Sequence, residues 1–257
     1  MARKHNWYFN SIHSSNFSRM KIFTSFLAFL FVGSSLLSQD GKLLEKEPFV
    51  ISERVVAKIR VADSILGAAL TNLNFYRITY LSDSLKVKGI LVEPKAEGKY
   101  PCIIANRGGN RDFGKWTPIS AAYFLGQMAA WDYVVIATQY RGVDGGEGTE
   151  EFGGKGLNDV LNLSKVLEQL PKADTSRIGL QGGSRGGMMT YLAMKSSCRF
   201  KAAVVIAGGA DLTESIKNRP KMETGVYSQL IPNYEANKEE ALKSRSAVYW
   251  ADKMCPT

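Results

Sequence analysis

The chain has 257 residues, which is enough for one sizeable α/β domain but leaves no room for a second large one. Its formal net charge is +9, of which residues 1–39 contribute +4, because they carry no acidic residue. The other charges are scattered rather than clustered. This pattern is typical of a solvated surface and argues against a nucleic-acid partner.

An apolar run covers residues 22–37, with Arg19 and Lys21 before it and small or polar residues after it. This three-part layout is typical of a secretory signal peptide. Residues 1–39 are therefore interpreted as an N-terminal extension and signal peptide, and the protein is expected to be exported to the periplasm or the extracellular space. We expect no stable membrane span after leader removal. The alternative is a membrane anchor formed by residues 22–37, whose length is near the lower limit for a span.

Residues 40–74 form a short lead-in with mixed helical and strand signals, and the main domain is expected over residues 75–257. Strand patterns at 75–81 and 86–93 flank a turn-prone Ser82-Asp83-Ser84 segment and predict an antiparallel hairpin. Further short apolar runs suit buried parallel strands. They cover residues 100–105, 133–138, 177–182 and 202–207.

Helical patterns lie between these runs. Thr117 and Pro118 offer an N-cap and a first-turn proline, and apolar residues continue to Ala130. A second helix has one apolar face over residues 157–170 and should end before Pro171. The alternation of strands and helices predicts an α/β fold with a mostly parallel sheet covered by helices on both faces.

Ser184 lies in a G-x-S-x-G spacing after the fifth of these strands and before a third helix, which is how a hydrolase presents a nucleophilic serine. Gly182 and Gly186 would supply the small residues that such a tight turn needs. The backbone amide of Arg185 would face a developing oxyanion, helped by the positive end of the helix. The alternative is an ordinary glycine-rich turn.

A second oxyanion donor is expected in the loop after the third strand, where Gly109 is the candidate, because glycine lets the backbone approach a substrate closely. The same loop could also be a plain strand-to-helix turn. Gly109, Gly114 and Lys115 match a phosphate-binding loop, but Trp116 stands where Ser or Thr would hold magnesium. We therefore disfavour nucleotide binding and expect no cofactor.

Other polar residues follow the strand ends. The glycine-rich segment 141–148 is interpreted as a shaped, mobile loop, or else as a flexible turn with solvated Asp144 and Glu147. Asp211 is expected to be a helix N-cap rather than a catalytic acid. Cys102 lies in an apolar strand pattern typical of a core residue. No C-x-x-C pair indicates a metal site, and a disulfide between two of the three cysteines stays open.

Several segments resemble, in order, the catalytic domain of the prolyl oligopeptidase family of serine peptidases, within the α/β-hydrolase superfamily. They are Tyr140-Arg141-Gly142, Arg177-Ile178-Gly179, Gly182-Gly183-Ser184-Arg185-Gly186-Gly187, Phe200-Lys201-Ala202-Ala203 and Ala251-Asp252-Lys253. The resemblance covers about residues 75–257. It implies that Ser184 forms an acyl-enzyme with a peptide or ester substrate and that Gly109 and Arg185 donate to the oxyanion. Arg107 replaces a histidine often seen in the family.

The resemblance also implies that the catalytic aspartate and histidine would follow the equivalent of Thr257. The histidines of this chain, His5 and His13, precede the apolar leader. We therefore expect an α/β-hydrolase domain that lacks its C-terminal strands and helix and is nearly inactive alone, because Ser184 has no base. The alternative is a non-catalytic binding module that keeps the hydrolase scaffold. The oligomeric state and the choice between peptidase and esterase are not indicated.

Overall fold

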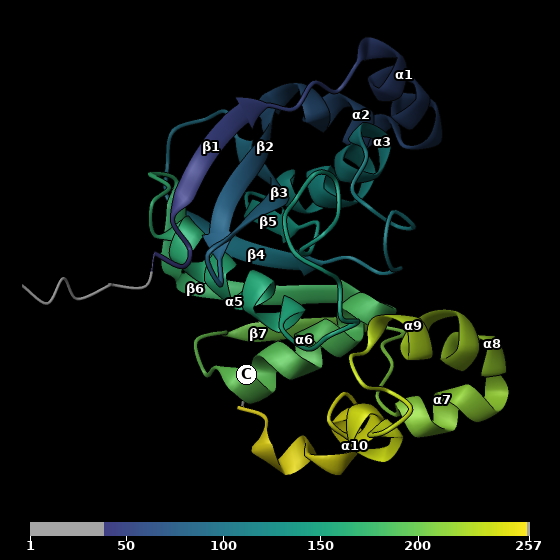
Figure 1. Ribbon diagram of the computed structural model, residues 1–257. Helices are drawn as coiled ribbons and strands as arrows, with labels where there is room; N and C mark the ends of the chain where they lie inside the picture. Colours follow the sequence, from purple (N-terminus) through teal and green to yellow (C-terminus); the bar gives the residue numbers. More distant parts are fainter. Residues whose placement is uncertain (1–38, 256–257) are drawn as a thin grey trace, which may run out of the picture. The chain divides into compact units, whose positions relative to one another are not determined.

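The computed structural model describes residues 39–255, and the predicted leader and both histidines lie outside this range. Seven strands form one mixed sheet in the order β1-β2-β3-β5-β4-β6-β7 (Figure 1). The strands are β1 (Leu43–Pro48), β2 (Leu73–Ser82), β3 (Leu85–Pro94), β4 (Tyr100–Asn106), β5 (Val134–Thr138), β6 (Ala173–Gly183) and β7 (Ala202–Ile206). Strands β4 to β7 run parallel, whereas β1, β2 and β3 pair antiparallel with their neighbours.

The predicted hairpin is confirmed as β2 and β3, but its strands are longer and its turn is shorter than expected. Ser82 pairs with Leu85, so only Asp83 and Ser84 connect the strands. Both have positive φ, of 51° and 63°. Two central residues with positive φ define a type I′ turn, whose twist matches that of the flanking strands.

Helices cover both faces of the sheet. One core lies between the sheet and α5 (Gly156–Leu167) with α6 (Arg185–Ser196). The opposite core contains the helices that precede β2 and those that connect β4 to β5. These are α1 (Glu53–Ala62), α2 (Ser64–Ala69), the single turn η1 (Leu70–Asn72), and α3 (Pro118–Ser120), η2 (Ala121–Leu125) and α4 (Gly126–Ala129). This double cover explains why the central strands are continuous apolar runs.

Helix boundaries follow the local signals read from the sequence. Thr117 caps α3 through a reciprocal capping box with Ser120, and Pro118 stands in the first turn. Helix α5 ends at Leu167, ahead of Pro171. Asp211 is confirmed as an N-cap, because its side chain accepts a hydrogen bond of 3.0 Å from the amide of Glu214.

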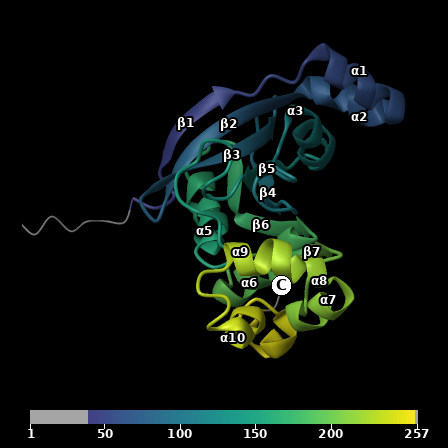
Figure 2. The same ribbon diagram turned by 45° about the vertical axis from the view of Figure 1, so that its right-hand side comes forward.

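After β7 the chain forms short helices that gather beside α6 and β7 (Figures 1 and 2). They are α7 (Leu212–Asn218), α8 (Pro220–Met222), η3 (Glu223–Tyr227), α9 (Ser228–Leu230), α10 (Lys238–Lys243), η4 (Ala247–Tyr249) and η5 (Ala251–Lys253). A disulfide joins Cys198, just after α6, to Cys255, just after η5. Cys102 is a free buried thiol in β4, as predicted for a core residue.

Strand β7 is an edge of the sheet and is only partly covered. Val205 packs against Gly187 and Gly208, on the side of α6. Val204 and Ile206 are 56% and 58% exposed. Because alternate side chains of a strand point to opposite faces, one face of β7 is apolar and open. Within the described part of the chain, no helix is both long and apolar enough to cross a membrane.

Candidate active site

Ser184 occupies the tight turn between β6 and α6. Its φ of 54° and ψ of −122° are a strained combination for a residue with a side chain. Its amide donates a hydrogen bond of 2.9 Å to the carbonyl oxygen of Ile206 in β7, and its side chain is exposed. Strained conformations persist where the surrounding structure enforces them, and they concentrate at functional sites.

The flanking glycines explain how this turn is enforced. A Cβ on Gly182 would lie 2.1 Å from the carbonyl oxygen of Gly186. A Cβ on Gly186 would lie 1.9 Å from the carbonyl oxygen of Asn106, at the end of β4. Both distances are far below van der Waals contact, so strand and helix can cross here only without side chains. The fold therefore requires glycine at positions 182 and 186, as the sequence predicts.

The loop after β4 lies opposite Ser184. A Cβ on Gly108 would be 3.4 Å from the Cβ of Ser184 and 4.0 Å from its Oγ. Gly109 has a φ of 71°, and any Cβ on it would lie 2.1 Å from the carbonyl oxygen of Phe113. Only glycine fits at position 109 with this loop conformation.

Both predicted oxyanion donors lie beside Ser184 around one cavity of about 250 Å³. The amide of Arg185 is the first of α6, so no carbonyl of the helix can accept from it. The amide of Gly109 donates to no group of residues 39–255. The structure thus brings Ser184, Gly109 and Arg185 together, as the sequence predicts, although their catalytic roles stay predictions.

The rest of this cavity is mostly apolar. Its walls come from the loop after β4, the segment before α5, the start of α6, the β7–α7 connection and the segment from α7 to η3. The apolar side chains among them are Phe113, Phe152, Met188, Leu212, Met222 and Tyr227. Arg219 is the second cation of the lining, beside Arg185, and no carboxylate of the described chain takes part in it.

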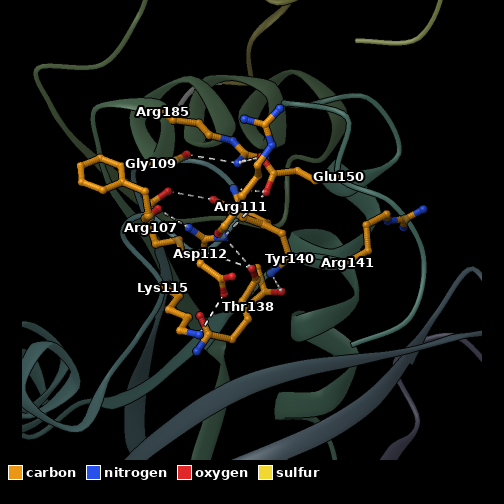
Figure 3. Close-up of polar contacts among 12 residues, drawn as sticks. Arg107, Gly109, Arg111, Asp112, Lys115, Thr138, Tyr140, Arg141, Glu150 and Arg185 are labelled. Atoms are coloured by element: carbon orange, nitrogen blue, oxygen red, sulfur yellow. Dashed lines mark hydrogen bonds and ion pairs between the residues drawn. The ribbon is translucent and has the colours of Figure 1, made fainter. Parts of the chain in front are cut away.

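Sequence reasoning missed a buried network of charges behind the site (Figure 3). Glu150 is 6% exposed and accepts a hydrogen bond of 2.5 Å from Nη1 of Arg185. Its other oxygen accepts from the amide of Arg111 at 2.8 Å and lies 3.9 Å from Nη2 of Arg107. In the sequence, Glu150 looks like any acidic residue of a solvated loop, and only its contacts with distant residues distinguish it.

The Arg107 side chain binds backbone carbonyl groups of the loop after β4. It is 2% exposed and is not among the residues that line the cavity, so the family histidine is replaced here by a buried side chain. Burial lowers the pKa of its guanidinium below the usual value, and Tyr140, whose ring lies 5.1 Å away, donates to the carbonyl oxygen of Arg107 at 3.1 Å. Burial also raises the pKa of Tyr140 to about 12, so the phenol stays protonated and able to donate.

The glycine-rich loop 141–148 is tied to the sheet. Glu147 accepts a hydrogen bond of 2.8 Å from the amide of Lys86 and returns its own amide to the Lys86 carbonyl at 2.8 Å. Asp144 lies 3.5 Å from the guanidinium of Arg77. Glu147 is exposed, as the solvated alternative predicts, whereas Asp144 is half-buried, and both carboxylates have partners that pattern alone does not identify.

In the rival phosphate-binding motif, Lys115 pairs with Asp112 at 2.9 Å. The Asp112 carboxylate thus neutralises the lysine charge that a bound phosphate would need. Among residues 39–255 there is also no group of three or more His, Cys, Asp or Glu that could hold a metal ion.

Several solved peptidases and esterases resemble this chain in fold. An acylaminoacyl peptidase of Pyrococcus horikoshii aligns with a TM-score of 0.59 and 22% identity, over 76% of this chain and 32% of that one. An acetyl xylan esterase of Paenibacillus sp. R4 aligns with a TM-score of 0.55 and 17% identity, over 85% of this chain and 81% of that one. These likenesses confirm the predicted α/β-hydrolase fold, with its mixed, largely parallel sheet between helices.

The family follows from sequence. The model of the prolyl oligopeptidase family, peptidase S9, matches residues 120–254. The uncharacterized peptidase YtmA of Bacillus subtilis (strain 168) is 37% identical over 185 residues, which cover 66% of this chain and 70% of YtmA. The chain therefore belongs to the prolyl oligopeptidase family. It spans about a third or less of the length of the solved peptidases that it resembles.

Proposed function

We propose that the chain carries the nucleophile of a serine hydrolase that cleaves peptide or ester bonds through an acyl-enzyme on Ser184. The observation that carries this proposal is the strained, exposed Ser184 at the start of α6, beside the Gly108–Gly109 loop. In the reaction, Oγ would attack a substrate carbonyl, and the amides of Gly109 and Arg185 would receive its oxygen. The fold relatives include both peptidases and esterases, so the leaving group could be an amine or an alcohol.

The base for this reaction would come from outside residues 39–255, which contain no histidine. Asp211, the acidic residue nearest in sequence to the end of β7, is engaged as the N-cap of α7. The open face and free edge of β7 could accept further strands that carry an acid and a base. The described part alone should then be nearly inactive, because losing the base costs on the order of a millionfold in turnover in a comparable protease.

Export is part of the proposal. The Cys198–Cys255 disulfide supports an oxidising compartment such as the periplasm or the extracellular space, where such bonds persist. The predicted leader, or the alternative anchor at 22–37, lies outside the described residues.

A binding module without catalysis is the second candidate, and the lack of a histidine among residues 39–255 favours it. It would keep the cavity and the fold but have no use for a strained serine. Both candidates predict low turnover, so turnover alone does not separate them. The reactivity of Ser184 does.

The experiment compares the 257-residue chain with its Ser184→Ala variant on p-nitrophenyl butyrate and on a short peptide p-nitroanilide, with and without imidazole as an external base. We expect near-background rates in buffer and an imidazole-dependent increase that only the wild-type chain shows. Vigorous turnover without imidazole that is lost in Ser184→Ala would contradict the predicted inactivity. Equal rates for both proteins at every imidazole concentration would support the binding module.

A further inference from the structure

Arg107 uses its whole guanidinium on backbone carbonyl groups. Nε and Nη2 donate to the carbonyl oxygen of Gln139 at 3.1 and 3.0 Å, and Nη2 also donates to that of Arg111 at 2.9 Å. Nη1 donates to the carbonyl oxygens of Gly108 at 3.2 Å and Phe113 at 3.1 Å. One side chain thus joins the end of β5 to both ends of the loop that faces Ser184.

The bond to Gly108 has a direct consequence for the site. The carbonyl of Gly108 and the amide of Gly109 belong to the same planar trans peptide, so they point in opposite directions. When Arg107 holds the oxygen, it fixes the direction in which the Gly109 N–H points, away from the guanidinium. That N–H is the donor that the proposed mechanism assigns to the oxyanion.

Glu150 links this support to the second donor. It binds Arg185 at 2.5 Å and the Arg111 amide at 2.8 Å, and lies 3.9 Å from Arg107. The same Nη1 of Arg185 also donates to the carbonyl oxygen of Gly109 at 3.2 Å. Removing Glu150 would leave the two buried guanidinium groups of Arg107 and Arg185 without their shared counter-charge.

The network also leaves a net positive charge beside the cavity. Two arginines share one carboxylate, and Nε and Nη2 of Arg185 are buried without a hydrogen-bond partner in the described structure. The Arg185 guanidinium stacks on the rings of Tyr140 and Phe152, at 4.5 and 4.9 Å. This stacking offsets part of the free-energy cost of burying the unpaired nitrogen atoms. A fixed positive charge beside the site stabilises a negative charge that develops on a substrate oxygen.

We propose that Arg107 and Glu150 are positioning residues of the oxyanion site. Arg107 orients the Gly109 amide by binding the Gly108 carbonyl, and Glu150 fixes the positions of the Arg107 and Arg185 side chains. This inference rests on the proposed function, because it assigns both residues to the transition state formed at Ser184. Neither residue lines the cavity.

The test uses a fluorophosphonate probe on the 257-residue chain, with imidazole in the buffer. Oγ of Ser184 forms a bond to phosphorus, the P–F bond breaks, fluoride leaves and imidazole takes the hydroxyl proton, while the phosphoryl oxygen occupies the oxyanion site. Intact-mass spectra give the maximal labelling rate and the probe concentration at half-maximal rate. Hydrogen exchange of the peptide covering residues 107–114 reports the order of the loop directly.

The variants are Arg107→Lys, which keeps the charge but loses the planar fork, and Glu150→Gln, which keeps the shape but loses the charge. We expect each to lower the maximal labelling rate about 10- to 100-fold, below the loss caused by deleting a whole oxyanion donor. The half-maximal concentration should stay within about twofold, and exchange of residues 107–114 should rise. The matched control is Arg141→Lys, a buried arginine paired with Asp159 at 2.7 Å, away from this loop. It should label like the wild type even if it is less stable.

Unchanged labelling in both variants, or unchanged exchange of residues 107–114, would overturn the positioning role. If Glu150→Gln shows no cooperative unfolding, Arg107→Lys decides the question alone. A wild-type chain whose Ser184 is never labelled would instead refute the proposed function. The exchange measurement then still decides whether Arg107 and Glu150 hold the loop.

Discussion

Gly186, in the first turn of α6, lies against the carbonyl of Asn106 at the end of β4, so closely that a methyl group on Gly186 would stand 1.9 Å from that oxygen. The contact joins the helix that carries Ser184 to the strand that leads into the opposite loop. A side chain at position 186 would push the two backbones apart. The distance across the site is therefore set by the absence of a side chain.

Gly186→Ala should destabilise the fold by at least about 1–3 kcal/mol, because the added methyl group meets rigid backbone. Urea unfolding at neutral pH measures the change. The matched control is Gly225→Ala in η3, where a Cβ would meet nothing within 4 Å and φ is not positive. It should leave stability unchanged or raise it by a few tenths of a kcal/mol. Equal stability of the two variants would contradict the close approach.

The strain at Ser184 predicts an unusual ranking of variants. With φ at 54°, alanine keeps the strain of the native residue, whereas glycine relieves it. Ser184→Gly should therefore be more stable than Ser184→Ala by about 1 kcal/mol, after the entropy cost of glycine in the unfolded chain. Thermal and urea unfolding of the two variants check this. If the alanine variant is the more stable, the turn is not strained in the folded protein.

Substitution of Asp211 distinguishes a capping role of its side chain from a catalytic role. Asp211→Ala should cost about 1 kcal/mol of stability through loss of the hydrogen bond to the Glu214 amide. It should not change the rate at which Ser184 is labelled. Asp63→Ala is a fair comparison, because Asp63 caps α2 in the same way, through a 2.9 Å bond to the Leu66 amide. A large fall in labelling for Asp211→Ala alone would show that its carboxylate takes part in the chemistry.

The sequence predicts the parts of this fold that local patterns encode. Continuous apolar runs locate the central strands, Pro171 and Asp211 mark helix boundaries, and Ser184 between glycines locates the turn, since each signal involves a few neighbouring residues. Local patterns do not predict strand β1. It pairs only with β2, five of its six residues are exposed, and so it shows no alternation of apolar and polar residues.

The supporting charges of the site were equally hidden, for a different reason. Glu150 follows a glycine-rich loop and precedes Glu151, and nothing local tells the buried carboxylate from its neighbour. Its partner Arg185 is 35 residues away, and the disulfide partners Cys198 and Cys255 are 57 residues apart. Such pairings depend on how β4, β6 and α6 come together, and the spacing of residues along the chain does not specify them.

The buried thiol of Cys102 gives a pH prediction. Burial raises its pKa to about 12 in the folded protein, against about 8.5 in an unfolded chain. The folded state therefore keeps a proton that the unfolded state releases, so this group weakens stability as pH rises above about 8.5 and until about 12. Between pH 8 and 10 the loss from this thiol should be about 2 kcal/mol. Cys102→Ala should show a flatter decline over that range in urea unfolding, whatever its stability at pH 7. Parallel curves for the two proteins would contradict the raised pKa.

The Cys198–Cys255 bond should contribute to stability through the unfolded state. It ties the end of α6 to the segment after η5, and the Cys255 amide also bonds the Met194 carbonyl at 3.1 Å. Closing a loop between residues 57 apart restricts the unfolded chain, so the Cys198→Ser, Cys255→Ser double variant should lose about 2–4 kcal/mol in urea unfolding. A reductant should lower the stability of the wild type by the same amount and leave the double variant unchanged. If the reductant has no effect on the wild type, the two cysteines are not joined in solution, and the end of the described chain is held by its packing against α6 alone.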